Sequence, residues 1–170
     1  MIERHPVTDR ESWLALRKRD VTASAVAGLF GAHPYTTAMA IYAEKTGLEL
    51  PEPDSAVLRR GRLLEGAVAA AAAEMRPDWK IIKATEYLRD PELRLGATPD
   101  FYIEGDARGL GVLQAKTVAP GVFKREWQDG PPFWIALQNA TELMLEYEAD
   151  FGVVAALVVD PWKLDCHLFD

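Results

Sequence analysis

The sequence predicts a mixed α/β or α+β fold, a sandwich in which helices flank a central mixed β-sheet. Helical spacing of apolar residues dominates the first 75 positions and returns at 133–147. Apolar, strand-like runs occupy the region between and the C-terminal end. The resulting order of helices, strand, hairpin, helix and two strands is typical of this architecture. With 170 residues, 49% of them hydrophobic, the chain is expected to form a single domain over residues 1–170.

Start and stop signals define the predicted helices of the first half. Thr8-Asp-Arg-Glu11 is a capping box, and glycines or prolines follow the later helical runs. The segment 48–54, which contains two prolines, is expected to be a loop. The predicted helices after the first are 23–30, capped by Thr22 and ended by Gly31; 37–46, ended by Gly47; and 56–75, capped by Ser55 and ended by Pro77.

The long helix 56–75 has an unusual composition. Gly61 and Gly66 each weaken a helix by roughly 1 kcal/mol relative to alanine, so we expect close packing or a nearby ligand there. Glu65 follows two leucines and precedes an alanine-rich stretch. It could face the interior, where a metal or an arginine would neutralise it, or pair with a neighbouring arginine at the surface. Its spacing favours neither.

The second half reads mainly as strands. A strand is predicted over 79–88, followed by a turn at 90–92 and by a β-hairpin with a long loop, whose strands contain 101–103 and 112–113. Pro120-Gly121 is expected to end the hairpin, and 127–132 to form a loop. The remaining elements are a helix over 133–147, a buried strand over 151–159 and a closing edge strand over 164–169.

Composition restricts the function. The net charge of −7 argues against non-specific coating of nucleic acid, although a local basic groove remains compatible with it. A single cysteine, Cys166, excludes an internal disulfide framework, which fits a reducing cytoplasm. The charged N-terminal stretch is unlike a signal peptide, and the longest apolar run is too short to span a bilayer, so no membrane association is expected.

The hairpin carries the strongest chemical signal. Asp100 begins its first strand, and Gln114 and Lys116 end its second on one face, because they are two residues apart. Pairing of the strands can bring the acid close to the amide and the ammonium. Such a set can hold a divalent cation and orient a water beside a phosphate.

A weaker signal lies near the N-terminus. Ser24 would lie in the first turn of the helix 23–30, where free backbone N–H groups favour an anion, and Arg17 could reach the same place. From spacing alone, an ordinary helix residue and a solvated arginine are the preferred interpretation.

Several pieces together resemble the YqaJ-type viral recombinase nucleases, which are relatives of phage lambda exonuclease within the PD-(D/E)-x-K superfamily. The resemblance runs from about residue 13 to about residue 159, and it implies a restriction-endonuclease-like core. The pieces, in chain order, are Arg17-x6-Ser24, Gly61-x2-Leu64-Glu65, Ala97-Thr-Pro-Asp100, Gln114-Ala-Lys116 and Gln138.

The resemblance implies roles for these residues. Asp100, Gln114, the main-chain carbonyl of Ala115 and Glu65 would bind Mg²⁺ or Mn²⁺. Lys116 would orient or activate the attacking water and stabilise the transition state. In the same way, Arg17 and Ser24 would hold a DNA 5′-phosphate, and Gln138 would position the DNA or the water.

Two positions depart from the family pattern. The family usually has glutamate where this chain has Gln114, so affinity for a hard dication is expected to fall. Ala136 stands where a second glutamine is common. The leading hypothesis is a metal-dependent deoxyribonuclease that degrades duplex DNA from a 5′ end in phage-type recombination. One alternative is a DNA-binding module of the same fold that no longer cuts, and another is an unrelated enzyme with a fortuitous hairpin.

The resemblance also implies partners. Linear duplex DNA with a 5′-phosphate is the expected substrate, in the cytoplasm of a bacterium or a phage-infected host. A single-strand annealing protein and a ring-like homotrimer are further expectations, since lambda-like relatives have both. Neither can be derived from the residues themselves.

Overall fold

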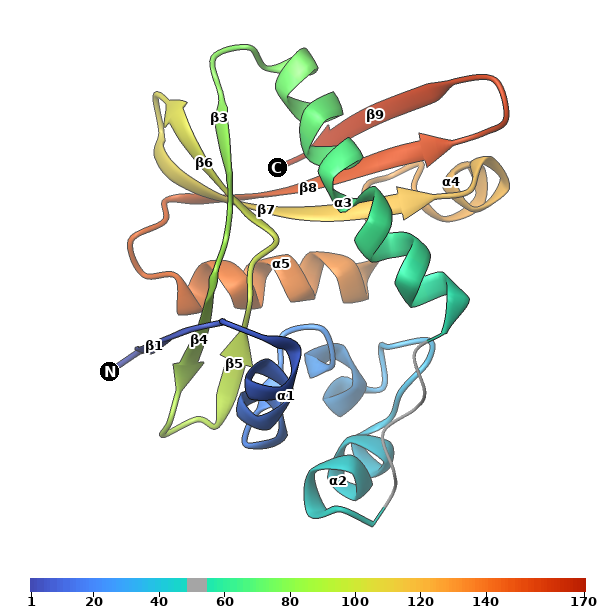
Figure 1. Cartoon of the computed structure of the whole chain (residues 1–170). Helices are drawn as coiled ribbons and strands as arrows, with labels where there is room; N and C mark the ends of the chain where they lie inside the picture. The colour runs from blue at the N-terminus through green and yellow to red at the C-terminus, as the bar shows by residue number, and fades with distance from the viewer. Residues whose placement is uncertain (49–54) are drawn as a thin grey trace.

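The computed structural model describes residues 1–48 and 55–170, so most of the predicted loop 48–54 lies outside the described residues. Helices predominate before residue 76 and strands after it (Figure 1). In chain order the elements are β1 Glu3–Pro6, α1 Arg10–Lys18, β2 Val21–Thr22, the 3₁₀ helix η1 Val26–Phe30, α2 Ala38–Thr46, α3 Ala56–Met75, β3 Lys80–Lys83, β4 Glu86–Asp90, β5 Leu95–Ala97, β6 Phe101–Asp106, β7 Gly109–Val118, α4 Pro120–Glu126, α5 Phe133–Leu145, β8 Phe151–Val159 and β9 Leu164–Phe169.

The strands form two sheets in the described part of the chain. The larger has the order β3-β6-β7-β8-β9, in which β7 and β8 are parallel and the other neighbours are antiparallel. The smaller has the order β1-β4-β5-β2. Because β7 and β8 are parallel, the chain must cross over between them, and α4 and α5 make this connection.

Helices cover both faces of the larger sheet (Figure 1). On one face, α3 packs against Leu113 of β7 and Ala155 of β8 through its buried residues Val68 and Ala72. On the other face lies α5, which also contacts β4 and β5 of the smaller sheet. Alternation along β7 therefore turns Gln114 and the other even-numbered residues toward α5.

Most of the predicted elements are confirmed. The fold is mixed α/β with helices on both faces of a mixed sheet, and β9 is the edge strand that closes it. The long helix has the predicted bounds, since the Ser55 side chain accepts a hydrogen bond from Leu58 N at its start. None of the helices in residues 1–48 and 55–170 combines the length and apolar character that a bilayer crossing requires.

The predicted helix 23–30 and strand 79–88 were wrong. Residues 21–22 pair with β5, and Ala23 N donates to Gly96 O, so only Val26–Phe30 forms a helix, of the 3₁₀ type. The region 79–88 divides into β3 and β4, which pair in different sheets. Strand pairing is a tertiary property, and a local pattern cannot reveal where a chain leaves one sheet for the other.

Smaller differences concern caps, turns and glycines. Asp9, not Thr8, caps α1 by accepting from Ser12 N. The hairpin turn is tight, with Asp106 opposite Gly109, and Pro120 begins α4, because proline fits the first turn of a helix. Side chains added at the two glycines of α3 would meet nothing within 4 Å, so close packing does not explain them.

Candidate active site

Asp100 directly precedes β6 and lies beside residues 114 and 115 of β7. Its Oδ2 accepts hydrogen bonds from Gln114 Nε2 at 2.6 Å and from the main-chain N–H of Ala115 at 2.8 Å. The pairing of Phe101 with Leu113 sets this register. The hairpin therefore brings Asp100 to Gln114, as the sequence predicted.

A chain of hydrogen bonds connects Lys116 to Asp100. Lys116 Nζ donates to Gln138 Oε1 at 3.0 Å, and Gln138 Nε2 donates to Gln114 Oε1 at 2.8 Å. Gln114 then donates to Asp100. Because an ammonium group can only donate, it fixes the orientation of both amides. Both are buried, so the chain is a defined internal network.

Glu142 extends this network toward the interior. Gln138 Nε2 also donates to Glu142 Oε1, at 2.9 Å. Glu142 is 1% exposed, and its Oε2 has no hydrogen-bond partner among the described residues. Burial, and then the charge of Asp100, raise the pKa of Glu142 to about 8. Its buried position therefore favours the protonated form of this carboxyl group.

Glu65 adds a second charge near Asp100. Burial, and then the charge of Glu65, raise the pKa of Asp100 to about 6. Glu65 projects from α3 and forms an ion pair with Lys83 of β3, whose ammonium lies 4.7 Å from the centre of the Phe101 ring. The sequence left open whether Glu65 faces the interior or forms an ion pair at the surface with an arginine. The structure shows an ion pair, but the partner is a lysine.

The residues around Asp100 fit a hard divalent cation in their chemistry. In residues 1–48 and 55–170, no three His, Cys, Asp or Glu side chains gather as a metal-ligand group. The available donors are the carboxylates of Asp100 and Glu65, an amide and a main-chain carbonyl. All are oxygen ligands, which Mg²⁺ and Mn²⁺ prefer, and a cation would relieve the repulsion that raises the pKa of Asp100. Gln114 Oε1 already accepts from Gln138, so ligation through this oxygen requires the amide to exchange partners.

A second cationic group lies between α1 and η1. Arg17 Nη2 is 3.4 Å from Ser24 Oγ and 3.5 Å from Thr22 Oγ1, and its guanidinium stacks over the Trp13 ring at 4.4 Å. No carboxylate forms an ion pair with Arg17 within the part of the chain that the structure describes. Burial lowers the pKa of Arg17. Ser24 precedes η1 and is not in the first turn of a helix, so any anion site here depends on the guanidinium and the hydroxyls.

The structure therefore joins four of the predicted residues directly, namely Asp100, Gln114, Lys116 and Gln138. The Ala115 amide and the Glu65 charge act on the same carboxylate, and Arg17 lies beside Ser24 in a separate group.

Two further residues belong to this cluster, Glu142 and Lys83. The spacing of four residues predicts that Glu142 shares one face of a helix with Gln138, but it gives Glu142 no role in the site. No signal in the sequence indicates Lys83, since its proximity to Glu65 depends on how α3 crosses the sheet.

Comparisons with known proteins agree with this fold. The crystal structure of LHK-Exo in complex with dAMP superposes with a TM-score of 0.65 at 19% sequence identity, covering 94% of this chain and 82% of that one. The crystal structure of an alkaline exonuclease, LHK-Exo, from Laribacter hongkongensis gives 0.65 at 17% identity, covering 94% and 81%. No curated protein sequence matches this chain significantly. The model of the YqaJ-like viral recombinase domain matches residues 12–144, most of the chain, and the protein therefore belongs to the YqaJ-like viral recombinase domain family.

Proposed function

We propose that this protein is a divalent-metal-dependent deoxyribonuclease that hydrolyses phosphodiester bonds of linear duplex DNA from a 5′ end, in phage-type recombination. The observation that carries the proposal is the buried hydrogen-bond chain from the Lys116 ammonium to the Asp100 carboxylate. An acid and an ammonium held by the same network provide a cation site and a positive charge next to each other, which phosphodiester hydrolysis requires.

Each residue has a role in this proposal. Asp100, Glu65, Gln114 and the carbonyl of Ala115 would hold Mg²⁺ or Mn²⁺, and the bound ion supplies charge neutralisation and a more acidic water. Lys116, positioned by Gln138, stabilises the charge that develops on the phosphate.

The 5′-phosphate binds elsewhere in this proposal. The guanidinium of Arg17, together with the Ser24 hydroxyl, binds it, since no carboxylate of the described residues forms an ion pair with this arginine.

The experiment is a cleavage assay on 5′-phosphorylated linear duplex with Mg²⁺ or with Mn²⁺. We expect the protein to release nucleotides and the Lys116→Ala variant to be at least ~100-fold slower. Lys80→Ala is the matched control, because Lys80 pairs with Glu104 at the protein surface. It should cleave at the normal rate. Arg17→Ala should lose the preference for a 5′-phosphate over a 5′-hydroxyl end.

A DNA-binding module that does not cut is the second candidate, and the neutral amide of Gln114 favours it. In that case the protein and its Lys116→Ala variant would bind duplex DNA equally and neither would cleave. This result would replace the nuclease proposal.

We further propose that residues 1–170 act as one nuclease domain, as a ring-like homotrimer, beside a single-strand annealing protein in the cytoplasm of a bacterium or a phage-infected host. The family membership supports this assignment. Analytical ultracentrifugation would test it, with a single trimeric species expected and a monomer at all concentrations as the contradicting result.

A further inference from the structure

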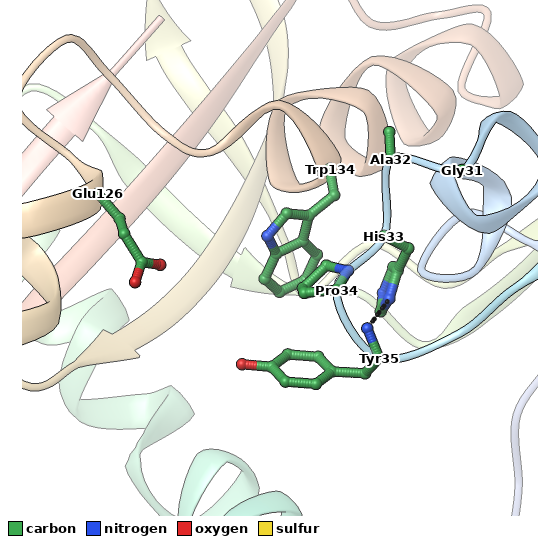
Figure 2. A pocket seen from close by; sticks show the side chains of 7 residues that line it. All are labelled: Gly31, Ala32, His33, Pro34, Tyr35, Glu126 and Trp134. Carbon is green, nitrogen blue, oxygen red and sulfur yellow. Dashed lines mark hydrogen bonds between the residues drawn. The ribbon is translucent and has the colours of Figure 1, made fainter.

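A cavity of about 350 Å³ lies beside the network and is not part of it. Its wall is formed by the segment 31–35 and by Trp134, with Glu126 on the opposite side, as Figure 2 shows. The volume is at the lower end of the roughly 300–1,000 Å³ that small-molecule sites occupy. We call the rings of His33, Tyr35 and Trp134 the aromatic pocket.

The three rings pack against one another. The His33 and Trp134 ring centres are 4.9 Å apart, and Tyr35 lies edge-on to Trp134 at 6.1 Å and to His33 at 5.9 Å. Tyr35 is 84% exposed, so much of its ring is available to a ligand. The cluster therefore presents aromatic surface to solvent while its members hold one another in place.

The aromatic pocket adjoins both charged groups of the proposed mechanism. Lys116 Nζ is 5.9 Å from the centre of the Trp134 ring, and Trp134 lies one helical turn before Gln138 on α5. On its other side, His33 lies near the main chain of Ser24, the residue beside Arg17. A molecule in the pocket would thus lie next to the places assigned to phosphates.

The chemistry of the pocket suits a flat, uncharged group. His33 Nδ1 accepts a hydrogen bond from Tyr35 N at 3.1 Å, and burial lowers the pKa of His33, which favours the neutral form of its ring. The charged side chain on the lining is Glu126, whose carboxylate pairs with Arg125 at 2.7 Å, so none of the described lining residues supplies a cation for a phosphate. A nucleobase meets both conditions, because each base has a π-face that stacks on aromatic side chains.

We infer that the aromatic pocket binds, by stacking, the nucleobase of the nucleotide whose phosphate lies beside Lys116. This inference rests on the proposed function, because it takes the ligand to be DNA. Stacking is tolerant of sequence, so all four bases are accepted. The pocket holds the nucleotide in register, so that its phosphate meets the ammonium.

Calorimetric titration with dAMP and with 2-deoxyribose 5-phosphate tests the inference, since the two ligands differ by the base. Both are titrated in EDTA, so that binding is measured without cleavage. We expect the protein to bind dAMP roughly 5- to 100-fold more tightly, the range that stacking on one aromatic residue gives. The Tyr35→Ala and Trp134→Ala variants should lose this difference, and Trp134→Phe should keep most of it.

Trp162→Ala is the matched control, because the Trp162 side chain is 93% exposed and lies on the connection between β8 and β9. It should bind both ligands as the unmodified protein does. Tyr35→Ala should fold normally, because an exposed ring contributes little to the core, so a loss of binding in this variant cannot be attributed to unfolding.

Equal affinity of the unmodified protein for the two ligands would overturn the inference, as would unchanged dAMP binding in both Tyr35→Ala and Trp134→Ala. The cleavage assay separates this failure from failure of the proposed function. If the protein cleaves DNA but the base adds nothing to binding, the base-binding inference is rejected and the nuclease proposal stands. If base binding depends on Tyr35 and Trp134 but the protein does not cleave, the nuclease proposal is rejected and the base-binding inference stands.

Discussion

Glu142 and Glu146 lie four residues apart at the end of α5, and both are closed off from solvent, yet their surroundings differ. Glu146 forms an ion pair with Arg4 and accepts a hydrogen bond from the Tyr102 hydroxyl at 2.7 Å. Glu142 accepts from an amide, and its second oxygen has no partner among the described residues. One acid is paired with a cation of the protein itself, whereas burial favours the protonated form of the other.

The same contrast separates Asp20 from Asp100. Asp20 is 1% exposed and receives two hydrogen bonds from Arg89, at 2.9 and 2.8 Å, and one from Tyr87. Asp100 receives its hydrogen bonds from an amide side chain and a backbone N–H, beside another acid. Buried acids next to guanidinium groups thus serve the fold, whereas those held by amides remain available for a cation or a proton.

The largest difference is expected between Asp20→Asn and Asp100→Asn. Asp20→Asn leaves the buried Arg89 without its main counter-charge and should lower the free energy of unfolding by about 3–5 kcal/mol. Asp100→Asn should lower the free energy of unfolding only slightly. The amide oxygen of the asparagine can accept the two hydrogen bonds that Oδ2 now accepts, and the repulsion by Glu65 disappears. Urea unfolding without metal measures both values. Equal losses would contradict the division into two classes of buried acid.

Glu142 of α5 and Glu146, which directly follows this helix, can each be replaced by the isosteric glutamine. Glu146→Gln should lose about 2 kcal/mol of stability at pH 7, because it removes the charge that faces Arg4. Glu142→Gln should instead gain about 1–4 kcal/mol at pH 9 over the unmodified protein. The sign follows from the raised pKa of Glu142, about 8 in the folded state against the ordinary 4.5. The folded protein holds this proton more tightly, so its stability falls as pH rises through that interval.

Thermal unfolding from pH 4 to pH 9 in EDTA measures this effect. The advantage of Glu142→Gln should be absent below pH 4.5 and should grow until about pH 8. A difference that does not depend on pH would mean that Glu142 is already ionised in the folded protein.

An acid at position 114 would change both the charge of the cation site and the contact with Asp100. Gln114→Glu adds a negative charge to the cation site and should tighten Mn²⁺ binding by about tenfold. It also removes the donor to Asp100, so the metal-free variant should melt at a lower temperature. Calorimetry with Mn²⁺ and thermal unfolding in EDTA test the two effects separately. Unchanged affinity for Mn²⁺ would show that position 114 lies outside the cation site.

The smallest effect concerns Gly66 in α3. A methyl group there meets nothing within 4 Å, so Gly66→Ala should raise the free energy of unfolding by about 0.5–1 kcal/mol through helix propensity. If DNA cleavage stays normal in this variant, the glycine serves no ligand. A loss of cleavage with a gain in stability would instead mean that DNA approaches the helix at this point.

The sequence was informative where function follows local geometry. Asp100, Gln114 and Lys116 could be placed together because strand alternation and one hairpin bring them to the same spot. The Gln138 contact also followed a predicted helix. The ends of α3 could be predicted because Ser55 and Pro77 mark them.

Features that depend on packing between distant segments could not be predicted. The split of 79–88 into two strands, the burial of Glu142 and the Lys83–Glu65 pair all arise from how the two sheets enclose α5 and how α3 crosses the larger one. Propensity and periodicity describe one segment at a time, and they carry no information about these contacts.

The cation site that we propose around Asp100 can be measured without DNA. Calorimetric titration of Mn²⁺ at pH 7 into the unmodified protein, Asp100→Asn and Lys116→Ala tests it most directly. One binding event is expected in the unmodified protein, retained in Lys116→Ala and lost in Asp100→Asn. Absence of binding in the unmodified protein, or equal binding in Asp100→Asn, would contradict the account.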